Sequence, residues 1–153
     1  MSLPGSNSIL MHSEKGCKLS LRNIFRSSPL INCIFINNTA GVYGGAISTG
    51  LLTDDISVNI TDCVFINNSA PMGGAIQIKG HNVKVTNSIF EGNEANESEG
   101  GAIFIVGNNA LVINSTFHCN SAKNCGAGIF INGSDASILN SSFENNFADY
   151  GAA

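Results

Sequence analysis

One short pattern recurs through most of this 153-residue chain and constrains its fold more than any other feature. The element Phe-x-x-Asn-x-Ala occurs five times, and its phenylalanines follow one another after 30, 25, 27 and 26 residues. The repeated residues are Phe35, Asn38, Phe65, Asn68, Phe90, Asn93, Phe117, Asn120, Phe143 and Asn146. A repeat of this length predicts a solenoid, in which each coil buries its apolar face only by stacking on its neighbours.

A glycine element follows each of the first four copies. It reads Gly-Gly-Ala-Ile three times, and the fourth copy is the variant Gly-Ala-Gly-Ile, with Ala127 and Gly128 exchanged relative to the others. The glycine pairs are Gly44 and Gly45, Gly73 and Gly74, and Gly100 and Gly101. We expect these pairs to let the backbone bend tightly into the next strand, because glycine adopts backbone conformations that other residues resist.

Within each repeat, apolar residues alternate with polar ones, as in ISVNI at 56–60 and VKV at 83–85. Alternation predicts strands, since successive side chains of a strand point to opposite faces. Asn or Asp also precedes each phenylalanine by three residues, which is typical of a turn. The sequence therefore predicts an all-β fold: a single-stranded, right-handed parallel β-helix of about five coils, each of 25 to 30 residues with three short strands.

The repeats divide the chain into two parts. We expect residues 1–29 to form a partly irregular N-terminal segment with a capping strand, and residues 30–153 to form the β-helix, truncated at its C-terminal end within the Gly151-Ala152-Ala153 start of another glycine element. Coils of a β-helix lie about 4.8 Å apart. The repeated phenylalanines should therefore stack as an internal aromatic ladder, and the repeated asparagines as an amide ladder at a corner.

The combination of the two elements resembles the polymorphic outer membrane protein (Pmp) repeat of chlamydial autotransporter passengers. The resemblance covers residues 30–153 and rests on five Phe-x-x-Asn copies in register with four glycine elements. It implies a non-catalytic passenger exposed at a cell surface, which adheres to a cell-surface protein or glycan receptor. In that family both elements are associated with adhesion, which would map to Phe35–Asn38, Gly44–Ile47 and their copies. The burial argument favours a scaffold role for these elements instead.

Outward residues are the alternative contact surface. If Phe35 and Phe65 point inward, their neighbours Ile34, Ile36, Val64 and Ile66 point outward, on a face that becomes polar in later coils. The same alternation turns Phe104 and Phe130 outward, stacked on adjacent coils. We take these six residues as a candidate binding face, because exposed apolar clusters mark contact surfaces. The alternative is that a neighbouring chain or the N-terminal segment, with Ile9, Leu10 and Met11, covers part of it.

Two other functions compete with adhesion. β-Helices also occur in polysaccharide lyases and hydrolases, which need converging carboxylates or acidic calcium ligands with a basic residue. The available residues are Asp54, Asp55, Asp62 and Lys84, and a turn position explains Asp62 more simply. No catalytic constellation or cofactor motif appears, and His12, His81 and His118 lack metal-ligand spacing. A structural spacer is the third hypothesis.

The five cysteines leave their redox state open. Cys33 and Cys63 each lie two residues before a repeated phenylalanine and should be neighbours on stacked coils, while Cys119 and Cys125 flank one turn. Either pair is a disulfide in an oxidising compartment or a pair of free thiols. The odd count leaves at least one thiol unpaired in a monomer.

Charge and hydropathy narrow the partners further. The net charge is −4, and the seven Lys and Arg residues do not cluster, which argues against nucleic acid. No apolar run is long enough for membrane insertion, and no secretion signal is visible. We therefore expect an internal piece of a longer, surface-displayed or extracellular protein. Because an open β-helix end exposes strand edges, we also expect end-to-end self-association.

Overall fold

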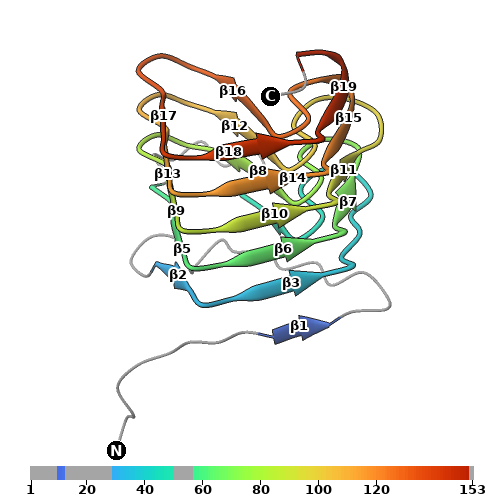
Figure 1. Ribbon diagram of the computed structural model, residues 1–153, viewed down its shortest axis with the longest axis horizontal. Coiled ribbons are helices and arrows are strands. Elements are labelled where there is room, and N and C mark those ends of the chain that lie inside the picture. Colours follow the sequence, from blue (N-terminus) through green and yellow to red (C-terminus); the bar gives the residue numbers. More distant parts are fainter. Residues whose placement is uncertain (1–9, 13–28, 50–56, 152–153) are drawn as a thin grey trace, which may run out of the picture.

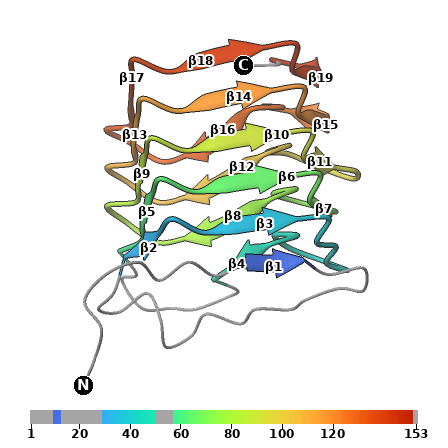
Figure 2. The same ribbon diagram turned by 60° about the horizontal axis from the view of Figure 1, so that its bottom comes forward.

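The chain forms a parallel β-solenoid, shown by a computed structural model that describes residues 10–12, 29–49 and 57–151. The described residues contain strands and turns but no helix, and every strand pair is parallel. Figure 1 shows the coils stacked one above another, and Figure 2 shows the same stack from a tilted direction. The right-handed solenoid has about four turns, close to the predicted five, and β17 to β19 begin another.

Four parallel sheets form the walls. The Phe sheet contains β1 (Leu10–His12), β3 (Ile34–Ile36), β6 (Val64–Ile66), β10 (Ile89–Glu91), β14 (Thr116–His118) and β18 (Ser142–Glu144). The Ala sheet contains β7 (Ser69–Ala70), β11 (Glu94–Ala95), β15 (Ser121–Cys125) and β19 (Phe147–Tyr150). The Gly sheet contains β4 (Ile47–Ser48), β8 (Ile76–Lys79), β12 (Ile103–Val106) and β16 (Ile129–Asn132). The lead-in sheet contains β2 (Leu30–Ile31), β5 (Asn59–Thr61), β9 (Lys84–Thr86), β13 (Leu111–Ile113) and β17 (Ser137–Leu139).

Each complete coil runs through the lead-in, Phe, Ala and Gly sheets in that order. The prediction of three strands per coil was therefore wrong. The strands of the Ala sheet begin one residue after the repeated asparagine, and two of them are only two residues long. A strand this short has no alternation by which sequence reasoning could recognise it.

Residues in the left-handed region turn the chain between the lead-in and Phe sheets. The residue three positions before each repeated phenylalanine has φ between 48° and 54°. These residues are Asn32, Asp62, Asn87, Asn114 and Asn140. The recurrent Asn or Asp is thus a turn residue, as predicted, because these two residue types tolerate a left-handed backbone better than most others.

The core is a ladder of phenylalanine rings on the inner side of the Phe sheet. Phe35, Phe65, Phe90 and Phe117 are fully buried, and ring centroids on successive coils are 4.8 to 4.9 Å apart with interplanar angles of 0° to 5°. Isoleucines and valines from the other walls complete the interior. Burying one such ring contributes about 1.5–3 kcal/mol before the entropy of the ordered chain is subtracted.

An amide ladder lies at the corner between the Phe and Ala sheets. The Nδ2 atoms of Asn38, Asn68 and Asn93 each donate to the Oδ1 atom of the asparagine one coil later, at 2.9 Å. The Nδ2 of Asn120 donates to Asn146 in the same way, at 3.0 Å. Each Oδ1 acceptor also receives the backbone N–H of the preceding coil's asparagine. The ladder therefore satisfies buried polar groups that would otherwise destabilise the corner.

The glycine pairs are required by close packing between coils. A Cβ atom on Gly101 would lie 2.3 Å from the carbonyl oxygen of Ala127 and 2.4 Å from that of Ser121. Gly100 has φ of +72°, where side chains are rarely tolerated. In the variant fourth element, a Cβ on Gly128 would approach Phe143 Cδ1 to 2.8 Å. Glycine at position 128, with alanine moved to the buried position 127, thus leaves room for the ring of Phe143.

The N-terminal strand β1 lengthens the Phe sheet. It pairs in parallel with β3, with Leu10 opposite Ile34 and His12 opposite Ile36. Because the pairing is edge to edge, β1 adds to the sheet and does not lie across its outer face. The remaining residues before position 29, including Ile9, lie outside the described residues.

Candidate binding surfaces

The outer face of the Phe sheet carries an apolar patch on its N-terminal half. Ile34, Val64 and Ile89 lie in register on three neighbouring strands, and Ile36 and Ile66 form a second column beside them. Ile34 is 37% exposed and Ile89 is 44% exposed, whereas Ile36, Val64 and Ile66 are half-buried. We call these five residues the apolar patch. They cannot enter the core, because the phenylalanines between them occupy it.

Polarity rises along the same face toward the C-terminal coils. The column that begins with Ile36 and Ile66 continues with Glu91, His118 and Glu144. The column that begins with Ile34 continues with Thr116 and Ser142. The apolar patch is thus bounded by polar residues on one side, which is the pattern of a contact surface.

Phe104 and Phe130 form the stacked pair expected on the Gly sheet, with ring centroids 5.2 Å apart and an interplanar angle of 3°. The expectation that both are exposed was wrong for Phe104, which is only 8% exposed. Phe130 is half-buried. The Phe130 ring lies against Phe104, and a Cβ added to Gly100 would lie 2.8 Å from the Phe104 Cβ, so the glycine turn packs closely against this side chain. Alternation predicts the direction of a side chain but not what covers it.

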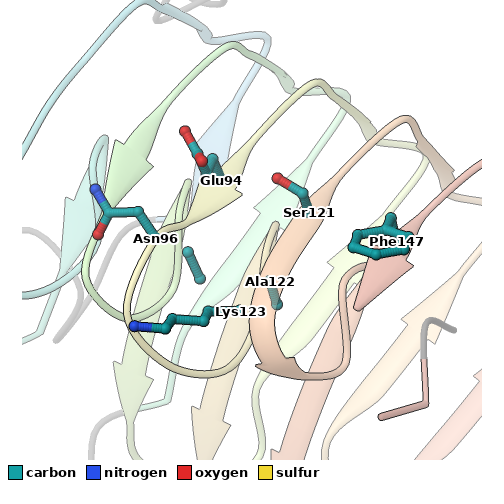
Figure 3. Close-up of a pocket in the computed structure, with 7 residues that line it drawn as sticks. Glu94, Asn96, Ser121, Ala122, Lys123 and Phe147 are labelled. Carbon is teal, nitrogen blue, oxygen red and sulfur yellow. The ribbon is translucent and has the colours of Figure 1, made fainter. Parts of the chain in front are cut away.

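A groove of about 340 Å³ lies on the outer side of the Ala sheet. Its lining residues are Glu94, Ala95, Asn96, Ser121, Ala122, Lys123 and Phe147. Figure 3 shows Glu94, Ser121 and Phe147 on successive strands, with Asn96 and Lys123 in a second row. Ala95 and Ala122 lie between the rows, and because both are buried in the inner cluster, no side chain rises into the groove at these two positions.

Sequence reasoning missed this groove. Its signal was nevertheless present, because Glu94, Ser121 and Phe147 each occupy the variable position between the repeated Asn and Ala. The repeated alanines Ala95 and Ala122 are buried in a small second cluster with Ala127, against which Ala148 packs. Alternation therefore turns the residue before each alanine outward.

No disulfide bond joins any of the four described cysteines. Cys33 and Cys63 are fully buried on adjacent coils, whereas Cys119 is exposed and Cys125 is half-buried. Burial, opposed in part by hydrogen bonding, raises the pKa of the Cys63 thiol to about 11, and proximity to Cys33 adds to the increase. In later coils the same position holds Ser88, Ser115 and Ser141, whose hydroxyls accept backbone N–H groups of the preceding coil.

The residues considered for catalysis do not form a site in the described part of the chain. Asp62 is an exposed turn residue with φ of 53°, and Lys84 is exposed on β9. Asp54 and Asp55 lie outside the described residues. Among the described residues, no group of three or more His, Cys, Asp or Glu side chains is arranged to hold a metal ion. The described residues also include no helix that is long and apolar enough to cross a membrane.

Comparison with known families accounts for the glycine and Phe-x-x-Asn elements. The family model of the Chlamydia polymorphic membrane protein (PMP) repeat matches three segments, residues 32–50, 62–79 and 87–106. Each segment runs from the turn before the Phe sheet to the Gly sheet of the same coil. The coil with the Gly-Ala-Gly-Ile variant is not among the matched segments. No curated protein and no solved structure gives a significant match.

Proposed function

Three segments of this chain match the polymorphic membrane protein repeat, and from that premise we propose that the chain is a non-catalytic, surface-displayed adhesin-like module. Proteins of the PMP family are associated with the outer membrane or the cell surface. The PMP repeat is not a known enzyme family. We therefore propose adhesion, surface display and a lack of catalysis for this chain. The match to the PMP repeat supports these properties only through what holds for the family.

The observation that carries the proposal is the apolar patch on the Phe sheet. A solenoid wall gains nothing in its core from outward isoleucines, because the inward phenylalanines already fill the interior. Ile34 and Ile89 nevertheless remain 37% and 44% exposed, two strands apart on one flat face. Contact with a partner would remove this apolar surface from water, at about 25 cal/mol for each Å² buried.

The chemistry of the patch favours a protein receptor. Its five side chains are aliphatic and carry no hydrogen-bonding group, so they suit the apolar centre of a protein interface, where charged residues are depleted. Glu91 and His118 lie at the border and would form part of a polar rim. The Phe and Asn ladders hold the face flat and rigid but are buried, so the repeated elements would act in adhesion as scaffold.

The experiment is a binding measurement on cells. Purified, fluorescently labelled chain is incubated with cultured animal cells before and after trypsin treatment of the cells. The proposal predicts saturable binding that trypsin abolishes. Binding that does not saturate, or that survives trypsin, would contradict a protein receptor. Incubation with polysaccharides is predicted to release no new reducing ends, and their release would contradict the non-catalytic assignment.

A further inference from the structure

The groove on the Ala sheet has a size suited to one small ring. Its volume of about 340 Å³ lies at the lower end of the range typical of small-molecule sites. Glu94 and Phe147 are two strands apart in register, which places their backbones about 9–10 Å apart. Ser121 lies between them in the row, so a single sugar ring placed over this short side chain would reach both Glu94 and Phe147.

The polar side chains around the groove are not engaged elsewhere. Within the described part of the chain, no hydrogen bond or ion pair involves the side chains of Glu94, Asn96, Ser121 or Lys123. By contrast, most buried asparagine and serine side chains of this solenoid have a partner one coil away. The four groove residues therefore keep their hydrogen-bonding capacity for water or a ligand.

The combination of groups selects a neutral ligand that is rich in hydroxyls. Glu94 only accepts hydrogen bonds, Lys123 only donates them, and Asn96 and Ser121 do both. A hydroxyl group matches all three kinds of partner because it donates one hydrogen bond and accepts two. The single carboxylate and single ammonium leave the lining without net charge, so the groove offers no excess of positive charge to a phosphate or a carboxylate.

Phe147 supplies the apolar part of the site. Its ring is 69% exposed at the end of the first row, where it lines the groove. The C–H face of a pyranose ring can pack on such an aromatic surface while its hydroxyls point toward the polar side chains. We propose that this groove binds one neutral pyranose residue of a glycan. This inference goes beyond the protein receptor proposed above, because the groove lies on a different sheet.

The test is a titration of the isotope-labelled chain with methyl pyranosides of glucose, galactose, mannose and N-acetylglucosamine, followed by amide chemical shifts. We expect saturable shifts with at least one sugar at millimolar concentration, confined to β11, β15, β19 and the turn after Ala95. The absence of saturable shifts for all four sugars would overturn the proposal, as would shifts centred on another sheet.

Matched variants test the two halves of the site. Phe147→Ala should weaken binding about tenfold, which corresponds to about 1.4 kcal/mol, whereas Tyr150→Ala on the same strand should leave it unchanged. Tyr150 is similarly exposed, at 72%, and does not line the groove. Glu94→Gln should weaken binding and Glu91→Gln should not, which keeps the test valid if Phe147→Ala does not fold. The assignment would be overturned if Phe147→Ala bound the sugar as tightly as Tyr150→Ala, and Glu94→Gln as tightly as Glu91→Gln.

The outcome is separable from that of the proposed function. Threonine substitutions in the apolar patch should leave the sugar-induced shifts unchanged, because the patch lies on the Phe sheet. If the unmodified chain shows no saturable, trypsin-sensitive binding to cells but does show the sugar-induced shifts, only the protein receptor is contradicted. Cell binding without sugar shifts would contradict only the groove.

Discussion

Asn93 and Asn120 are 27 residues apart in the chain, yet two hydrogen bonds join them, and both end on Asn120 Oδ1. The backbone N–H of Asn93 donates at 3.0 Å and its Nδ2 donates at 2.9 Å. The second proton of Nδ2 goes to the carbonyl oxygen of Phe65 in the preceding coil, at 3.0 Å. One buried amide thus connects three coils, which makes the ladder a principal source of stacking register.

The variant Asn93→Ala should therefore be strongly destabilising. It removes four hydrogen bonds and leaves the backbone N–H of Asn68 buried without its acceptor. We expect the free energy of unfolding to fall by more than about 2 kcal/mol. Urea denaturation measures this, with Asn132→Ala as the control, because Asn132 is exposed at the end of β16. Equal denaturation midpoints for the two variants would show that the ladder is not important for stability.

The second glycine of the three Gly-Gly-Ala-Ile elements should tolerate no side chain. In Gly101→Ala, the new methyl carbon would meet two backbone carbonyl oxygens at 2.3 and 2.4 Å, and backbone cannot move aside without separating the coils. We expect loss of soluble folded protein or a destabilisation of several kcal/mol. Gly41→Ala is the control, since a Cβ there has no neighbour within 4 Å. Circular dichroism and thermal unfolding distinguish the two, and a Gly101→Ala protein as stable as wild type would contradict the packing described.

The Cys63 thiol should make stability fall at alkaline pH. Its pKa in the folded chain is about 11, against an ordinary value of 9.0, because burial disfavours the thiolate. The folded state therefore holds this proton more tightly than the unfolded state. The resulting contribution to stability is complete below about pH 9 and is lost as the pH rises toward about 11. Urea denaturation across this window measures the loss.

Cys63→Ser is the matched control for that experiment, because Ser88 and Ser115 occupy the same position in the next two coils. The variant should retain the fold and lose the part of the alkaline destabilisation that belongs to the thiol. An unchanged pH profile in Cys63→Ser would assign the effect to other groups.

The C-terminal coil should drive end-to-end association. Phe143 and Asn146 are only half-buried there, and Leu139 is 51% exposed. At the opposite end, β1 already pairs with β3 and extends the Phe sheet. Sedimentation velocity should show species larger than the monomer as concentration rises, and Leu139→Lys should reduce them. A monomer at all concentrations would exclude this association.

Much of the fold could be predicted from the sequence because each coil places the same residue types at its buried, corner and turn positions. The position of Phe90 is ambiguous in isolation, but five phenylalanines at matching positions identify an inward column, and the paired asparagines identify a corner. The turn residues could be predicted for the same reason. The two-residue strands of the Ala sheet could not, because a pattern of period two needs more than two residues to appear.

The candidate surfaces were predicted less completely. The outward direction of Ile34 and Ile66 follows from alternation alone, and the structure leaves Ile34 exposed. The burial of Phe104 could not be anticipated, because it depends on a turn that packs against it from the same coil and on a ring from the next one. The groove depends on side chains from three coils, among which Phe147 departs from the Thr, Ser and Glu found at its position elsewhere.

Binding through the Phe sheet is tested most directly by the affinity of one double variant for cells. Ile34→Thr combined with Ile89→Thr removes the two most exposed residues of the patch, and Thr116 already occupies this column in the fourth coil, so the strand is preserved. Val42→Thr is the control, because Val42 is 58% exposed outside the patch. We predict at least about tenfold weaker binding for the double variant and unchanged binding for Val42→Thr. A folded double variant that binds as tightly as wild type would contradict the account.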